Sequence, residues 1–357
     1  MISEYSPDER ALIIADSFSE LTYKQKKYFL ASTNLQGDKR QKYADILIKT
    51  LGDGVYNKLR DKFSDSKYAE KVLDSLVRRA ISCVTLKSGL YPEELKNIPV
   101  PPLVLYARGN VQLLSDKKVA VVGSRRSTPQ ALAECSKICG ELTRKLTVVT
   151  GVADGADSAA IKGALASGRI IAVLPGGHDS GCAAHASLLA KVEANGLSVS
   201  EFPPKFKAQR YTFILRNRII AGLTGGTLVV SAAERSGALS TASYAADYGR
   251  DVLAFPYSLG VASGEGCNAL IKKGAYLCEN ALDIFSLFGL ELPVEQSPDL
   301  SAEEAAVFGA IRGGGEVHAS EIARVTGKSL RDVGAICSLL EIKGLIIRTG
   351  GNKYAAV

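Results

Sequence analysis

Two motifs place arginines where an α/β protein binds phosphate. Val119-Ala-Val-Val-Gly-Ser-Arg-Arg126 has paired arginines directly after a predicted buried strand, and Arg216-Asn-Arg-Ile-Ile-Ala-Gly222 has two on the opening turns of a predicted helix. Backbone N–H groups at a helix start are unpaired and carry the positive end of the helix dipole, and each guanidinium adds a planar fork of donors. These motifs indicate phosphate binding, either of a nucleotide or of a nucleic acid strand.

Two glycine-containing loops are further candidates for this binding. In Gly123-Ser124-Arg125 we predict a phosphate-binding turn, followed by Thr128 as N-cap and Pro129 at the first helical position. The loop from Thr150 to Asp157 supplies Gly151 and Gly155, which allow close approach of another backbone. We predict Asp157 as the cap of the following helix. For Asp154 a role in orienting an arginine of the neighbouring loop stays open.

A third loop alternates cations with aromatic rings. Between Ser200 and Phe213 the chain carries Lys205, Lys207 and Arg210, interleaved with Phe206 and Tyr211. This pattern is typical of proteins that hold a single strand without sequence preference, because bases stack on rings while cations follow the backbone. It favours a strand over a free nucleotide, although we expect at least one ring to anchor the loop to the core.

A fourth loop, Glu234 to Thr241, presents another helix start. We predict Ser236 as its cap and Gly237 as the residue that gives access to it. Signals of catalysis are scarce. His178 and His185 have neither metal-site spacing nor a nucleophile partner, the seven cysteines contain no Cys-x-x-Cys pair, and Gly327-Lys328-Ser329 lacks the earlier glycine of a P-loop. We predict no enzyme activity, no metal and no cofactor.

Charge is concentrated where the arginine motifs lie. The 357 residues carry a net charge of +7, of which residues 101–150 contribute +5 and residues 201–250 contribute +4. This distribution predicts one electropositive groove for an anionic partner. No apolar run approaches the roughly 20 residues of a membrane span, and no leader segment is evident, so we expect a cytoplasmic protein.

The chain divides into a helical N-terminal domain (1–88), an α/β core (89–290), a linker (291–300) and a winged-helix domain (301–357). Mostly β-branched runs predict six core strands, and helical stretches between them predict a mostly parallel sheet. The runs are Val119–Val122, Val148–Thr150, Ile170–Leu174, Leu197–Ser200, Thr227–Val230 and Val252–Phe255. Ligands of such sheets bind at the carboxyl ends of the strands.

The C-terminal domain has helical segments starting near Ser301, Ala319 and Ser329, followed by a ribbon around Gly350. Its third helix is predicted to bury Leu330, Val333, Ile336, Leu339 and Leu340 and to expose Arg331, Asp332, Glu341 and Lys343. Because that outer face is nearly neutral, we favour a structural or protein-docking role over sequence-specific reading of DNA.

Together these motifs resemble the DprA/Smf family of DNA processing proteins. The resemblance covers most of the chain, from Tyr91-Pro-Glu-Glu-Leu95 through Gly123-Ser-Arg125, Gly151 to Asp157, Ser200 to Pro204, Arg216 to Leu223 and Ala233 to Leu239 to Gly266 to Ile271. It implies a Rossmann-like core, a SAM-like helical domain, non-specific binding of single-stranded DNA, a homodimer, and delivery of incoming DNA to RecA recombinase during natural transformation. It implies no catalysis.

The predicted DNA-binding residues follow from the loops and from this resemblance. They are Gly123, Ser124, Arg125, Gly151, Lys205, Lys207, Arg210, Phe213, Arg216, Asn217, Arg218, Ser236 and Gly237. The chain departs from the family pattern at Cys182-Ala183 and at Tyr257, and neither change removes a basic group. Two alternatives stay open, a nucleotide-processing or nucleotide-sensing enzyme on the same scaffold, and a regulator that uses the C-terminal domain on duplex DNA.

Overall fold

The computed structural model describes residues 5–18, 21–34, 37–180, 185–291, 300–312 and 315–356. The chain separates into two compact units, Met1–Leu290 and Glu291–Val357. Most of the predicted linker, and the family departure at Cys182-Ala183, lie outside the described residues. None of the helices in these described ranges is both long and apolar enough to cross a membrane.

The first unit begins with helices that pack around aromatic side chains. At the start of α1, Ser6 and Glu9 form a reciprocal capping box and Pro7 occupies the first turn, so the helix begins where the sequence supplies both devices. Phe18, Phe29 and Tyr56 are almost fully buried between the helices. The helices are α1 (Pro7–Asp16), α2 (Tyr23–Asn34), α3 (Gly37–Leu51), α4 (Asp53–Ser64) and α5 (Ser66–Val77).

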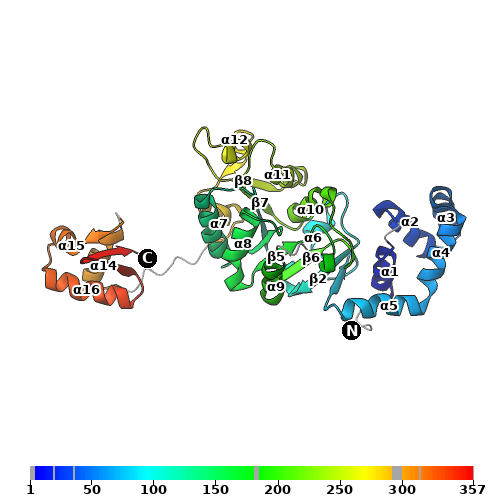
Figure 1. Cartoon of the computed structure of the whole chain (residues 1–357), viewed down its shortest axis with the longest axis horizontal. Helices are drawn as coiled ribbons and strands as arrows, with labels where there is room; N and C mark the ends of the chain where they lie inside the picture. The colour runs from blue at the N-terminus through cyan, green and yellow to red at the C-terminus, as the bar shows by residue number, and fades with distance from the viewer. Residues whose placement is uncertain are drawn as a thin grey trace. The chain divides into compact units, whose positions relative to one another are not determined.

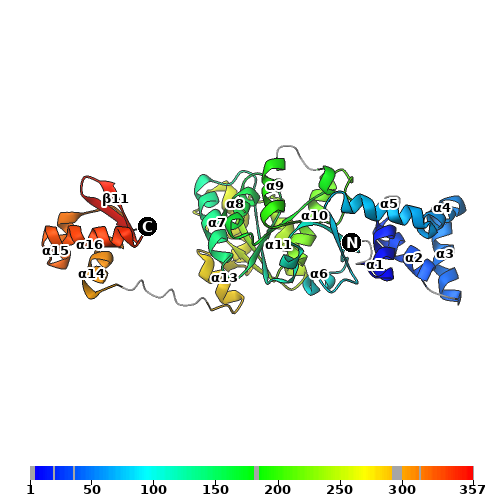
Figure 2. The same ribbon diagram turned by 90° about the horizontal axis from the view of Figure 1, so that it is seen from below.

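A nine-stranded sheet forms the centre of the first unit (Figures 1 and 2). Its spatial order is β1-β2-β6-β5-β4-β3-β7-β8-β9, and all neighbours are parallel except β1 with β2 and β2 with β6. The strands are β1 (Ser82–Thr85), β2 (Val104–Gly109), β3 (Lys118–Gly123), β4 (Thr147–Thr150), β5 (Ile170–Val173), β6 (Leu197–Ser200), β7 (Gly226–Ser231), β8 (Asp251–Ala254) and β9 (Tyr276–Leu277).

The six predicted strands are all present, as β3 to β8, and the mostly parallel α/β class is confirmed. Every residue of β4, β5 and β6 is buried, which is the pattern expected when helices cover both faces of a sheet. Strands β1, β2 and β9 were not predicted from the sequence. Strand β1 lies within the segment assigned to the helical domain, so the sheet begins earlier than that boundary.

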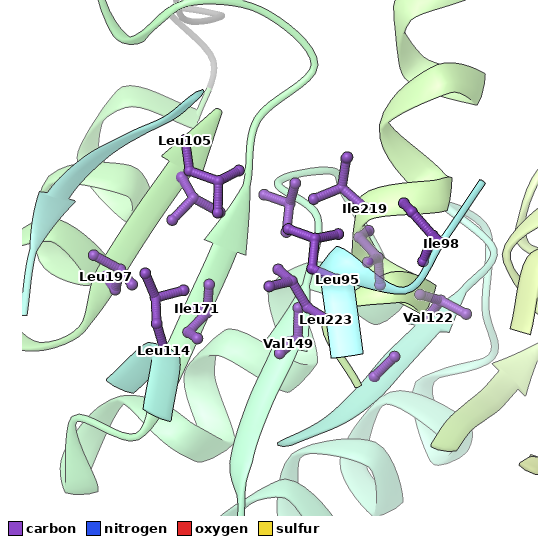
Figure 3. Close-up of a cluster of buried hydrophobic side chains, with 14 of the residues drawn as sticks. Leu95, Ile98, Leu105, Leu114, Val122, Val149, Ile171, Leu197, Ile219 and Leu223 are labelled. Carbon is purple, nitrogen blue, oxygen red and sulfur yellow. The ribbon is translucent and has the colours of Figure 1, made fainter. Parts of the chain in front are cut away.

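Helices cover the sheet on its two faces, with α7, α8 and α9 on one and α6, α10 and α11 on the other. Figure 3 shows Leu95 and Ile98 meeting Ile219 of α10 and Leu223, which directly follows α10, near the sheet residue Val122. Burial of each such side chain stabilises the fold by about 1.5 to 3 kcal/mol. The core helices are α6 (Glu93–Lys96), α7 (Pro129–Leu142), α8 (Ala156–Ala164), α9 (Ala186–Asn195), α10 (Arg210–Gly222), α11 (Ala238–Asp247), α12 (Glu265–Lys272) and α13 (Ala281–Leu287).

Polar contacts fasten the helical segment to the sheet. The Asp16 carboxylate, at the end of α1, accepts hydrogen bonds from Tyr106 of β2 at 2.8 Å and from Lys26 of α2 at 2.9 Å. The Tyr5 hydroxyl accepts from the Cys83 N–H of β1 at 2.9 Å. Asp16 is 5% exposed, so these bonds satisfy a carboxylate that would otherwise be costly to bury.

The second unit has the predicted helix, helix, helix and ribbon order of a winged helix. Its elements are α14 (Ala302–Arg312), β10 (Val317–His318), α15 (Ala319–Thr326), α16 (Leu330–Ile342), β11 (Ile346–Gly350) and β12 (Lys353–Ala356). The Ser301 and Glu304 capping pair is present, and Gly327 ends α15 with φ +68°. Gly327 therefore lies in a turn between two helices, α15 and α16, and not after the strand that a P-loop requires.

One feature of α16 differs from the prediction. Val333, Ile336 and Leu340 are buried as expected, but Leu330 is 59% exposed and Leu339 is 50% exposed. Cys337 takes the remaining buried position instead. The actual stripe follows the positions that face α14 and α15, whereas the predicted stripe was wider than those two short helices can cover.

Candidate nucleic-acid interface

The strand order reverses at β3, which has β4 on one side and β7 on the other. The chain builds one half of the sheet from β3 to β6 and then crosses back through α10 to place β7 beside β3. Such a reversal leaves a crevice beyond the carboxyl ends of the strands, where α/β sheets bind ligands. The loops singled out by sequence follow β3, β4, β6 and β7 and therefore lie at this edge.

The Gly-Ser-Arg turn after β3 is held by its neighbours on both sides. Ser124 donates its N–H to the Ser231 carbonyl at 2.8 Å, and its own carbonyl accepts from the Ala156 N–H at 3.2 Å. A Cβ on Gly123 would lie 2.6 Å from that of Ala156, so only glycine fits. Thr128 caps α7 with Pro129 in the first turn, as predicted. The turn is fixed before any ligand arrives.

Arg125 leaves this fixed turn and is exposed. Its guanidinium carbon lies 5.8 Å from the centre of the Phe213 ring, in the first turn of α10. The contact joins the loop after β3 to the helix that follows the basic loop, so two of the predicted regions meet in space. A guanidinium over an aromatic face keeps its outer N–H groups available to a phosphate.

Arg216, in contrast, points into the protein and is 7% exposed. Its Nη1 donates to the Val173 carbonyl at 2.7 Å, at the end of β5, and it is a charge partner of the buried Asp157. Burial raises the pKa of Asp157, and the charge of Arg216 opposes that rise. A side chain on Gly151 would collide with both charged groups. Gly151 therefore makes room for these two oppositely charged side chains.

This arrangement corrects two roles predicted for acidic residues. Asp157 is not the cap of α8, because Gly155 occupies the N-cap position and the carboxylate turns inward to Arg216. Asp154 does not orient an arginine, because its side chain is 77% exposed and lies 3.8 Å from Nδ1 of His185. The sequence shows two aspartates three residues apart at a helix start, but not that one of them faces an arginine sixty residues away.

Arg218 also differs from its predicted role as a phosphate ligand. It is 7% exposed, pairs with the Glu201 carboxylate and donates to the Val100 carbonyl at 2.5 Å. Burial raises the pKa of Glu201, and the Arg218 charge opposes that rise. Because the guanidinium is neutralised and enclosed by the protein, it does not face the same space as Arg125. We therefore withdraw Arg218 from the set of phosphate ligands.

Asn217, between these two arginines, links α10 to α11. Its side-chain amide donates to the Ser240 hydroxyl at 2.8 Å and its oxygen accepts from Arg216 Nε at 3.2 Å. Gly237 is the N-cap of α11, in place of the predicted Ser236, whose hydroxyl instead accepts from the Ala238 N–H at 3.3 Å. Gly237 is exposed and has open space around it.

The loop between β6 and α10 presents the remaining cations. Lys205, Lys207 and Arg210 are all exposed. Phe206 anchors the loop, as expected of one ring, because it stacks on Phe202 with ring centres 4.4 Å apart. Tyr211 stays 55% exposed.

Together with the turn after β3, these cations form what we call the exposed basic rim: Arg125, Arg126, Lys205, Lys207 and Arg210. Arg126 and Arg235 are exposed members of the quoted motifs that the predicted set of DNA-binding residues does not include. The signal that could have found them is their position, directly after β3 and beside Gly237. Their charges add to the sheet edge at the carboxyl ends of the strands. The exposed side of that edge is positive, while the buried arginines beneath it lie beside carboxylates.

The fold and these motifs agree with comparisons to known proteins. The family model "DNA recombination-mediator protein A" matches residues 82–289, which contain the whole sheet, and a DprA winged-helix model matches residues 291–352. The chain belongs to the DprA/Smf family. DprA of Bacillus subtilis is 38% identical over 230 residues, which cover 62% of this chain and 75% of that protein.

Solved structures of DprA proteins have the same fold. That of Streptococcus pneumoniae DprA aligns with a TM-score of 0.57 and 30% identity over 76% of this chain and 99% of the other. That of Helicobacter pylori DprA aligns with a TM-score of 0.53 and 27% identity, over 58% and 95% of the two chains, and its description concerns its single-stranded DNA binding mode. The expected family membership and winged helix are thereby confirmed, and the chain is a member of a family of DNA-processing proteins.

Proposed function

We propose that this chain binds single-stranded DNA along the exposed basic rim without sequence preference. The observation that carries the proposal is the meeting of Arg125 with Phe213, which brings cations and rings from distant segments to one edge of the sheet. Cations neutralise successive phosphates, and a neighbouring ring such as Tyr211 offers a face for a base. The single-stranded DNA binding mode described for the Helicobacter pylori relative supports the same ligand class.

We further propose that the bound strand is protected and handed to RecA recombinase, by a homodimer acting in the cytoplasm as a binding protein and not as an enzyme. Support comes from the family resemblance and from the description of the matched family as a recombination mediator. A mediator must hold a strand firmly yet release it. Exposed, salt-sensitive contacts suit that requirement better than buried ones, since they exchange readily with solvent ions.

The test measures oligothymidylate affinity at several salt concentrations. Replacing Arg125 with Ala, or Lys205 and Lys207 together, should weaken binding and flatten the log-log salt dependence by about 0.7 for each phosphate that is no longer neutralised. The exposed pair Lys272 and Lys273, at the C-terminal end of α12, offers a matched control, whose replacement by Ala should leave the slope unchanged. Equal slopes for the rim variants and the wild type would refute the proposed interface.

Two further experiments address the alternative functions, one with a competitor and one with a truncated chain. A nucleoside monophosphate should displace the oligonucleotide only at far higher concentration than a second oligonucleotide does; equal potency would indicate a nucleotide pocket. Removing residues 291–357, the second compact unit, should preserve single-strand binding by the first unit. Loss of all binding would assign recognition to the winged helix.

A further inference from the structure

The helical part of the first unit carries a charge excess that the whole-chain average conceals. Residues 21–80 contain 14 Lys and Arg against 7 Asp and Glu, so this segment alone has a net charge of +7, as large as that of the chain. Residues 1–20 contain five acidic residues against one basic residue and mask the excess in a longer window. A domain with this field attracts a polyanion.

Within this segment, α2 and α3 combine lysines with tyrosine rings. Lys24 Nζ lies 5.7 Å from the centre of the Tyr28 ring, and Lys27 Nζ lies 5.7 Å from that of Tyr23. Tyr28 packs against Tyr43 of α3, with ring centres 5.3 Å apart and planes inclined by 35°. We call Tyr23, Lys24, Lys27, Tyr28 and Tyr43 the tyrosine–lysine surface.

The charges on this surface are available to a ligand. Lys24 and Lys27 are exposed and make no ion pair with any residue in the described ranges, whereas Lys26 between them is bound to Asp16 at 2.9 Å. The three tyrosines are half-buried. One exposed carboxylate, Asp45 of α3, is near this surface in sequence and leaves the balance positive.

A nucleic acid strand fits this chemistry better than a membrane does. None of the exposed large apolar side chains among the described residues belongs to α2 or α3, so nothing there would insert into a bilayer. Rings alternating with lysines along a helix instead match the stacking and phosphate contacts by which proteins hold single strands.

One residue of the tyrosine–lysine surface also lies within electrostatic range of the core. Tyr23, which begins α2, is close enough to Arg218 and Glu201 for both charges to act on its hydroxyl group. Arg218 lies on α10, five residues after Phe213, which corresponds to about 7.5 Å along the helix axis. The start of α2 therefore lies within electrostatic range of α10, the helix that supports the exposed basic rim.

We propose that the tyrosine–lysine surface is a second contact for single-stranded DNA and binds nucleotides that extend past the exposed basic rim. This inference rests on the proposed function, because the strand must first be held at the core. It predicts two classes of ligand. A short oligonucleotide is held by the rim alone, while a longer one also reaches α2 and gains affinity from it.

The experiment compares the full chain with its Lys24→Glu/Lys27→Glu variant on oligothymidylates of about 6 and about 30 nucleotides. The longer oligonucleotide should bind the variant at least about tenfold more weakly, with a salt slope lower by about 1.4 because two phosphates are no longer neutralised. Affinity for the shorter one should stay unchanged.

Two controls separate this effect from general charge or folding. Lys67→Glu/Lys71→Glu makes the same charge change at exposed positions of α5 and should leave both affinities within twofold. Tyr28→Ala should weaken the longer complex about fivefold or more, as removal of one stacked base does, and Tyr28→Phe should restore it. Circular dichroism melting confirms that each variant is folded.

The outcomes distinguish this inference from the proposed function. If the short oligonucleotide does not bind the wild-type chain at all, the proposed function fails. If it binds but Lys24→Glu/Lys27→Glu leaves the affinity for the long one unchanged, the second contact is wrong. If the α5 control variant loses as much affinity for the long oligonucleotide, the effect comes from overall charge and not from a defined contact. If Lys24→Glu/Lys27→Glu loses binding to phosphatidylserine vesicles but keeps its affinity for the long oligonucleotide, the ligand of this surface is a membrane and not a DNA strand.

Discussion

The exposed basic rim and the buried arginines beside it carry the same charge in opposite surroundings. Arg125 projects from the turn after β3 over Phe213, while Arg216 and Arg218 on α10 are enclosed with Asp157 and Glu201. The rim offers positive charge to a ligand, whereas the buried arginines and carboxylates hold the loops of the rim in place. A motif rich in arginine therefore does not by itself identify its ligand-binding members, because some of them hold the loops in place.

The largest effect expected from this difference is on stability. Replacing Arg216 with Ala leaves the Asp157 carboxylate buried without its charge partner, which should lower the free energy of unfolding by about 3 to 5 kcal/mol. Urea denaturation measures the change, and Arg216→Ala/Asp157→Asn should recover part of it. A variant of Arg216 that unfolds like the wild type but does not bind DNA would place this residue on the rim instead.

A second buried group, His178, makes the free energy of unfolding depend on pH. Burial and the nearby Arg108 lower its pKa to about 4 from 6.5. Below pH 6.5 the unfolded chain therefore takes up a proton that the folded chain refuses, so stability present above that pH is lost as pH falls towards 4. The contribution approaches about 3 kcal/mol. The difference in unfolding free energy between the wild type and His178→Gln should shrink across this range; a constant difference would contradict the assignment.

Two glycines of the site provide a matched pair for the next effect. Gly123 has no room for a Cβ, and Ala there should cost about 1 to 3 kcal/mol through overpacking against Ala156. Gly237 has open space and ordinary backbone angles, so Gly237→Ala should change stability by less than about 0.5 kcal/mol. Thermal unfolding of both variants tests the contrast, which would be broken by equal destabilisation.

The smallest stability effect belongs to the rim itself. Arg125→Ala and Arg126→Ala remove exposed side chains and should each change the unfolding free energy by less than about 0.5 kcal/mol. The same variants should nonetheless weaken oligothymidylate binding, since their charges serve the ligand and not the fold. Destabilisation comparable to that of Arg216→Ala would erase the distinction between the two regions.

Much of the fold was predictable from the sequence for local physical reasons. The six strands β3 to β8 are short, mostly apolar runs between helical patterns, and Thr128 with Pro129 marks the start of α7 unambiguously. Strands β1 and β2 were missed because their pairing is antiparallel and joins segments about twenty residues apart around a proline-rich stretch. Nothing in either run alone distinguishes a sheet edge from a connecting segment.

The candidate site was predictable in position but not in the direction of its side chains. Arg216 and Arg218 are two residues apart on α10, yet both find buried carboxylates, supplied by α8 and by the end of β6. Those partners come from distant segments, so spacing along α10 could not reveal them. Lys205 and Lys207 remain exposed because no such partner reaches their loop among the described residues.

The most direct test of the account is to find where a bound strand touches the protein. Oligothymidylate irradiated with ultraviolet light in complex with the full chain should cross-link to aromatic side chains, and mass spectrometry of the digested protein should locate the adducts. We expect adducts on the peptide containing Tyr211 and Phe213, which lie at the exposed basic rim. Adducts confined to residues 300–356 of the winged helix would contradict the account.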